Sequence, residues 1–106
     1  MAKYLIQASY TPEGLKGLAK DKASGRKQAV SDALESVGGT LIDIYYAMGE
    51  WDVYVIAECP DNLAAISISA KVCSSGLVRT STVPLFTVEE ADQMFSKAVA
   101  YRAPGA

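Results

Sequence analysis

The sequence contains no histidine, only two cysteines and no long apolar run. Without histidine, the chain lacks the usual acid or base of neutral-pH catalysis, the proximal ligand of most haem sites and a common zinc ligand. Cys59 and Cys73 are too far apart for a C-x-x-C motif, so zinc and thioredoxin-type redox sites are not indicated. No segment approaches the roughly 18 consecutive apolar residues of a membrane span. We therefore expect no metal, no cofactor and no membrane partner.

Neither sign of charge is in large excess: the chain has 10 Lys and Arg and 12 Asp and Glu, which leaves a formal charge of −2. A chain without a basic excess is a poor candidate for binding nucleic acid. Half of the 106 residues are apolar, and this hydrophobic composition suggests that part of the surface needs a partner. Residues 1–10 lack the apolar core and cleavage site of a signal peptide, which together with two free thiols predicts a cytoplasmic protein.

Alternation and helical spacing predict seven elements in one domain over residues 1–102, followed by a loose tail over 103–106. Thr11 and Pro12 are typical of a helix start, and Ala23-Ser24-Gly25 interrupts the apolar pattern of that helix, which predicts a break or a kink. Residues 66–72 fit either a strand or a helix, and Asp61 as a potential cap favours the helix. Thr87 and Glu90 have the spacing of a capping box for a last helix, with an apolar stripe through Val99. The expected strands cover residues 3–10, 40–48, 51–59 and 77–86, and the expected helices cover 11–37, 61–75 and 87–99.

This order predicts an α+β fold of the ferredoxin-like βαββαβ type, with a four-stranded antiparallel sheet and an additional C-terminal helix. Pro84 is expected at a sheet edge or strand end, because proline has no backbone N–H to donate to a neighbouring strand. The first two helices of such a fold cover one face of the sheet and leave the other face open. Assigning the more apolar side of each strand to the helices places ten residues on the open face: Leu5, Gln7, Ser9, Asp43, Tyr45, Tyr54, Ile56, Glu58, Arg79 and Ser81.

The apolar members of this set would form a patch of roughly a few hundred Å², the size at which surface patches mark interaction sites. We expect a second copy of the chain to cover it, giving a homodimer or a higher homo-oligomer. Arg79 could act as the fixed donor for a small polar or anionic ligand. Alternatively, Arg79 pairs with Asp43 or Glu58 at a dimer seam.

The segment Gly49-Glu50-Trp51-Asp52 places a turn glycine before an aromatic residue and a carboxylate. It is either turn architecture, with positive φ at Gly49 and Asp52 bonded to the backbone, or the rim of a pocket with Trp51 as a wall. The basic run from Lys16 to Lys27 is read as a solvated helix face, with anion binding as the alternative. No catalytic residue is indicated. The candidate ligand-binding residues are Gln7, Ser9, Asp43, Tyr45, Trp51, Asp52, Tyr54, Glu58 and Arg79.

Several segments give the sequence a resemblance to a known family: Tyr4-Leu5, Tyr10 to Gly14, Arg26, Gly38-Gly39, Gly49 to Asp52, Pro60-Asp61 and Gly76 to Thr80. In these segments the chain resembles the bacterial GYD-domain family of short single-domain proteins. Trp51 stands where the name-giving Gly-Tyr-Asp motif has tyrosine. The resemblance implies a fold of the dimeric α/β-barrel type, in which two ferredoxin-like units pair through their sheets. It implies no particular activity, because a fold alone does not specify a reaction.

Three functional hypotheses follow. The first is a cytoplasmic homo-oligomeric domain that binds a small molecule on the open sheet face. The second is a structural or interaction module without a pocket. The third, a small cofactor-independent enzyme of the oxygenase or isomerase type, rests on fold analogy.

Overall fold

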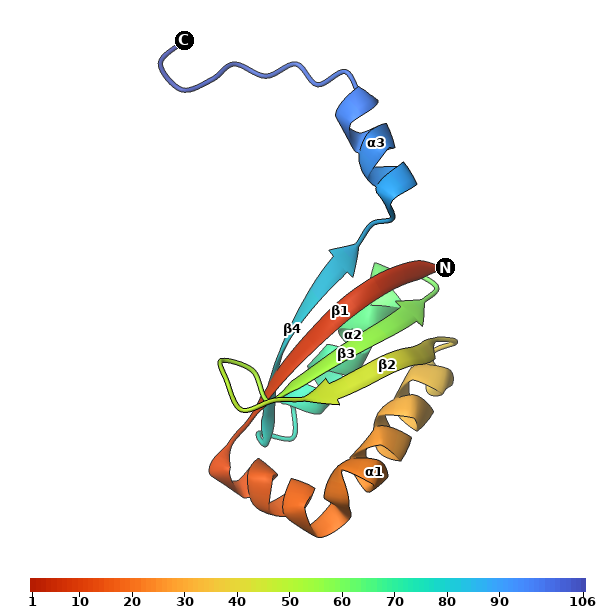
Figure 1. Ribbon diagram of the computed structural model, residues 1–106, viewed down its shortest axis with the longest axis vertical. Helices are drawn as coiled ribbons and strands as arrows, with labels where there is room; N and C mark the ends of the chain where they lie inside the picture. The colour runs from red at the N-terminus through yellow and green to blue at the C-terminus, as the bar shows by residue number, and fades with distance from the viewer.

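A computed structural model describes all 106 residues and shows the predicted order of elements (Figure 1). The strands and helices are β1 (Ala2–Tyr10), α1 (Pro12–Ser36), β2 (Thr40–Tyr46), β3 (Val53–Cys59), α2 (Asn62–Cys73), β4 (Val78–Leu85) and α3 (Val88–Ser96). The α+β prediction of a βαββαβ unit followed by a C-terminal helix is confirmed. None of the helices is long and apolar enough to cross a bilayer.

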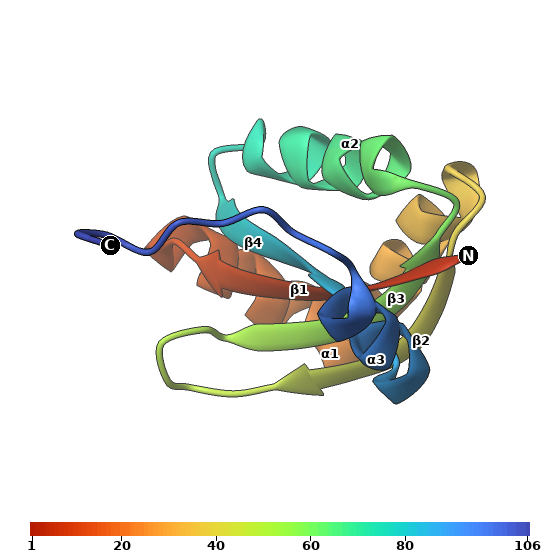
Figure 2. The ribbon, with the colours of Figure 1, turned by 90° about the horizontal axis from the view of Figure 1, so that it is seen from above.

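The four strands form one antiparallel sheet in the order β2-β3-β1-β4. Pro84 lies on the edge strand β4, as predicted. Helix α2 lies behind the sheet in Figure 1, so the opposite face of the sheet is turned toward the viewer. Figure 2 shows α2 to one side of the strands.

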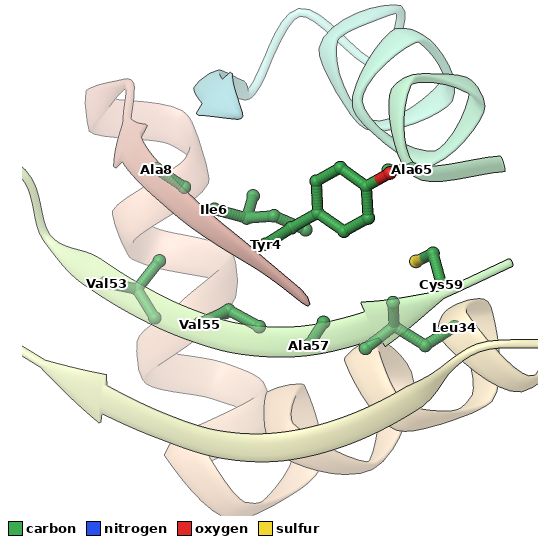
Figure 3. Packing of buried hydrophobic residues seen from close by; sticks show 9 residues of the cluster. All are labelled: Tyr4, Ile6, Ala8, Leu34, Val53, Val55, Ala57, Cys59 and Ala65. Carbon is green, nitrogen blue, oxygen red and sulfur yellow. The ribbon is translucent and has the colours of Figure 1, made fainter. Parts of the chain in front are cut away.

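The core lies between the sheet and the helices, where alternate residues of the two central strands are buried. Tyr4 reaches from β1 toward α2 (Figure 3). Its hydroxyl donates a 2.6 Å hydrogen bond to Asn62 Oδ1. Leu34 brings the second half of α1 against the end of β3. The buried cluster comprises Tyr4, Ile6, Ala8, Leu34, Val53, Val55, Ala57, Cys59 and Ala65.

The prediction for the start of β2 is wrong at two positions. Unbroken alternation with Asp43 and Tyr45 on the open face puts Leu41 on that face too and Ile42 on the helix side, but the register of β2 against β3 shifts between Leu41 and Asp43. With one extra residue in the strand, the residues before the shift point to the opposite face from the one that simple alternation predicts. Leu41 therefore packs against the core, whereas Ile42 is 46% exposed. Asp43 and Tyr45, beyond the shift, keep their predicted face.

Helix α1 is broken at Lys22, where φ is 64° and ψ is 162°, one residue before the predicted interruption. Figure 1 shows its two halves meeting at a wide angle, with the first half leading away from the end of β1. Thr11 caps the first half by accepting a 3.2 Å hydrogen bond from the Gly14 N–H. A Cβ on Gly14 would collide with the Leu77 carbonyl oxygen, so this glycine allows α1 to start close to the chain before β4.

The other two helices begin at the predicted caps. Asp61 accepts a 2.9 Å hydrogen bond from the Ala64 N–H, which confirms the choice of helix for residues 66–72. Thr87 and Glu90 form the predicted capping box. However, α3 ends at Ser96, so the predicted stripe does not reach Val99 as helix.

Helix α3 and the following residues project beyond the end of the sheet (Figure 1). No residue of α3 is buried. The radius of gyration is consequently 16.6 Å, compared with about 13 Å for a compact chain of 100 residues.

Candidate functional site

The open face of the sheet gathers five of the predicted site residues at one end. Gln7 lies opposite Tyr54 on β3, and Tyr54 lies opposite Tyr45 on β2. On the other side of β1, Ser9 lies opposite Arg79. Facing residues of neighbouring strands are about 5 Å apart, so these side chains form one continuous polar and aromatic surface. We call Gln7, Ser9, Tyr45, Tyr54 and Arg79 the Arg79 corner.

Of the two predicted carboxylates of the open face, Glu58 lies at the other end of the sheet, and Asp43 lies next to Tyr45 on β2 but is separated from Arg79 on β4 by two strands. Glu58 faces Lys3 on β1 and Thr40 on β2, and Asp43 faces Ile56. The six-residue separation of Lys3 and Ser9 along β1 corresponds to about 20 Å. Within one chain Arg79 therefore forms no ion pair with either carboxylate, and the only ion pair in the structure joins Lys16 to Glu13.

Arg79 is held by an aromatic ring instead. Its guanidinium carbon lies 4.8 Å from the centroid of the Trp51 ring, within the range of a cation–π contact. Trp51 is buried, whereas Arg79 is exposed. The ring thus supports one side of the guanidinium and leaves N–H donors available to a further group.

Asp52 is bound into the turn before β3. Its carboxylate accepts a 2.8 Å hydrogen bond from the Tyr10 N–H, and its own N–H donates to the Ala8 carbonyl at 2.8 Å. Its carbonyl accepts from the Ala47 N–H. These bonds extend the pairing of β1, β2 and β3, so the turn interpretation accounts for Asp52 without a ligand. Gly49 does not have the expected positive φ, and a Cβ there would meet nothing within 4 Å.

Apolar side chains continue the open face beyond the Arg79 corner. Leu5 lies between Ile56 on β3 and Val83 on β4. Tyr45 is 62% exposed, and no helix of the chain covers this face. The predicted combination of polar and apolar groups is therefore present and uncovered in the single chain.

A second set of polar groups lies on the opposite side of the sheet, beneath α1, and the sequence did not predict it. The bend in α1 leaves a hollow of about 230 Å³ against α2 and the start of β4, and Arg26 and Tyr10 line it. The Arg26 Nε is buried and has no hydrogen-bond partner. In the sequence, Arg26 falls within a basic run that is expected to be a solvated helix face, and its other signal is its place among the segments that carry the family resemblance.

Tyr46 adds a second phenol to this region, and its hydroxyl donates a 3.5 Å hydrogen bond to the Ala23 carbonyl in α1. Burial raises the pKa of Tyr46, and nearby Tyr10 raises it further, whereas the Arg26 charge acts in the opposite direction. Three polar side chains thus lie close together among apolar neighbours.

The two thiols show no sign of a shared site. Cys59 is buried in the core, and desolvation raises its pKa, with the Asp61 charge as a smaller cause. Cys73 is exposed, and its Sγ lies 3.3 Å from Thr80 Oγ1. No group of three or more Cys, Asp or Glu side chains is arranged to hold a metal ion.

Comparison with protein families settles the relationship that the motifs suggested. The GYD-domain family matches residues 4–95. The chain belongs to the GYD-domain family. The match extends from β1 to the end of α3, so the projecting helix is part of the GYD domain. No curated protein matches the chain.

Proposed function

We propose that this GYD domain acts as a homo-oligomer, joined through the open sheet faces, that binds a small polar or anionic ligand at the Arg79 corner. The observation that supports the proposal most strongly is the uncovered apolar surface of Leu5, Ile56 and Val83, next to a fixed and unpaired guanidinium. Burying a Leu or Ile side chain contributes about 1.5–3 kcal/mol, so covering this face with a second copy is favourable.

Helix α3 supports the same assembly. Val88 is 76% and Phe95 is 90% exposed, although both are apolar and lie seven residues apart on one side of the helix. An isolated helix shorter than about 12 residues is only marginally stable in water, so the nine residues of α3 need a surface to pack against. A second copy supplies that surface and enlarges the interface toward the roughly 800 Å² per partner of stable complexes.

The ligand class follows from what covering the face would do to Arg79. A guanidinium removed from water requires an acceptor or a counter-ion. Trp51 provides neither, and the neighbouring Gln7, Ser9 and Tyr54 offer acceptor oxygens but no negative charge. A small anion bound between the subunits would accept hydrogen bonds from Arg79 and balance its charge.

Native mass spectrometry of freshly purified protein tests the proposal. The expected spectrum shows an oligomer carrying non-protein mass, and Arg79→Ala loses that mass while Arg102→Ala, which removes an exposed arginine near the end of the chain, retains it. A monomer, or an oligomer without bound mass that shows no thermal shift with a panel of small anions, contradicts the ligand proposal.

An interaction module without a ligand site is the second candidate. It is favoured by one observation, namely that the main hollows in the single chain lie along α1 or between the N-terminus and the start of α3 rather than at the Arg79 corner. For this candidate, the expected result is a clean oligomer mass in which Asp43 or Glu58 of one subunit pairs with Arg79 of the other. The two free thiols are consistent with the cytoplasmic location that we propose for either candidate.

A further inference from the structure

The bend in α1 leaves a half-open hollow against α2 and the start of β4. Lys22 has φ 64° and ψ 162°. Residues other than glycine rarely adopt this combination, which costs about 1–3 kcal/mol. Figure 1 shows α1 arching beside the sheet, with its bend near the far end of the molecule from α3. Strained backbone of this kind is often found at functional sites.

The space beneath the bend has an outer and an inner part. The outer hollow measures about 230 Å³ and the inner about 60 Å³, and they share Tyr10, Arg26, Val72 and Val78 as lining. Leu18 and Leu77 add apolar surface to the outer part, and Val30 and Ile44 to the inner part. Small-ligand sites have this character, namely an apolar wall with a few convergent polar groups. The volume of the outer hollow lies below their usual range of about 300–1,000 Å³, so it suits only a small ligand.

Arg26 is the polar group that the fold leaves unsatisfied. It stands where the two hollows meet, its Nε is buried, and its side chain forms no hydrogen bond or ion pair in the chain. Buried donors without a partner are rare in native proteins, because leaving one unpaired is costly. The Tyr46 hydroxyl already donates to the Ala23 carbonyl, so the free phenol of this space is that of Tyr10, which lines both hollows and can donate to an acceptor beside Arg26.

The geometry points to a binding site beneath α1 for a small monocarboxylic acid with an apolar body. The carboxylate accepts hydrogen bonds from the Arg26 guanidinium and a neighbouring phenol, and the apolar body lies in the outer hollow against Leu18, Val72 and Leu77. Asp21 also borders the outer hollow. Its negative charge disfavours a ligand with a second carboxylate.

This site does not depend on the proposed function. All of its lining residues belong to one chain, and they lie on the helix side of the sheet, opposite the Arg79 corner. A variant that separates the subunits should therefore retain the site, and Arg79→Ala should leave it unchanged.

Calorimetric titration of the full chain with benzoate or hexanoate tests the inference, with benzyl alcohol and adipate as comparison probes. Benzoate or hexanoate is expected to bind more tightly than either comparison probe. Arg26→Gln should weaken binding about tenfold or more, because it removes a charged donor. Lys27→Gln removes the neighbouring exposed positive charge and should change the affinity less than about twofold.

A second variant blocks the space without disturbing the core. Gly17 lines the outer hollow, a Cβ there meets nothing within 4 Å, and leucine is a better helix former than glycine. Gly17→Leu should therefore fold normally and abolish binding. The inference is overturned if no monocarboxylate binds the wild-type chain at millimolar concentration, if benzyl alcohol binds as well as benzoate, or if Arg26→Gln and Gly17→Leu leave the affinity unchanged.

Discussion

The Arg79 guanidinium lies 4.8 Å from the centroid of the Trp51 ring, and this contact joins edge strand β4 to the segment that leads into β3. The two strands are separated by β1 in the sheet. The contact therefore crosses the end of β1 and fixes the position of the cation that we place at the centre of the ligand site.

Removing this cation should alter the environment of Trp51, the only tryptophan in the chain. Arg79→Ala is expected to shift the tryptophan emission spectrum and to lower the free energy of unfolding by about 0.5–1 kcal/mol, the usual contribution of an exposed cation–π contact. Fluorescence-monitored urea unfolding measures both effects. Arg102→Ala serves as the control and should change neither. An unaltered emission spectrum in Arg79→Ala would show that the contact is absent in solution.

Asp52 should be important for stability. Asp52→Ala leaves the Tyr10 N–H without its 2.8 Å acceptor, and the loss of a partner by such a donor costs about 1–3 kcal/mol. Asp43→Ala removes an exposed carboxylate from β2 and is expected to stay within about 0.5 kcal/mol of the wild type. Chemical denaturation of the two variants compares these values, and equal stability would refute the structural role of Asp52.

The bend in α1 gives a prediction with opposite signs at two nearby lysines. Lys22→Gly should stabilise the chain by about 1 kcal/mol, because glycine adopts positive φ without strain. Lys20→Gly, at a helical and exposed position, should destabilise it by about 0.5–1 kcal/mol. Thermal unfolding measures both. A loss of stability in Lys22→Gly equal to that in Lys20→Gly would indicate a regular helix at Lys22.

Stability should fall at alkaline pH. Burial is the main cause that raises the pKa of Tyr4, Tyr46 and Cys59 above their ordinary values of 10.0, 10.0 and 9.0. Since each folded-state pKa lies above the unfolded value, the neutral groups contribute fully below about pH 9. That contribution is lost as pH rises through the folded pKa values, because the unfolded chain releases its protons first.

Tyr4→Phe isolates one part of this effect. The variant loses the hydrogen bond to Asn62 and should be about 1 kcal/mol less stable at pH 7, but its stability should fall less steeply above pH 10. Tyr101→Phe, which changes an exposed tyrosine, should follow the wild-type profile. Urea unfolding from pH 7 to 11 measures the slopes, and identical slopes for Tyr4→Phe and the wild type would contradict the assignment.

The elements of the fold were predictable because their signals are local. Thr11, Asp61 and Thr87 each cap a helix through a backbone N–H three residues ahead, and such spacing is visible in the sequence. The alternation in β1 and β3 likewise reveals which residues share a face. The shift at Leu41 in β2 leaves no comparable signal, since it depends on how β2 pairs with β3.

The candidate sites were predictable only in part, for the same reason. The open face follows from strand alternation, so Gln7, Tyr54 and Arg79 could be assigned to it. The stacking of Arg79 on Trp51 depends on the path of the loop before β3, and the burial of Arg26 depends on the direction of a bend. Neither contact is encoded in the spacing of nearby residues.

Sedimentation velocity at about 10 µM protein tests the central claim, which is that a second copy covers the open sheet face. The wild type should sediment as a dimer or larger. Leu5→Glu, which places a charge in the middle of that face, should sediment as a folded monomer, whereas Lys20→Glu on α1 should remain associated. A wild-type chain that sediments as a stable monomer at this concentration would contradict the claim.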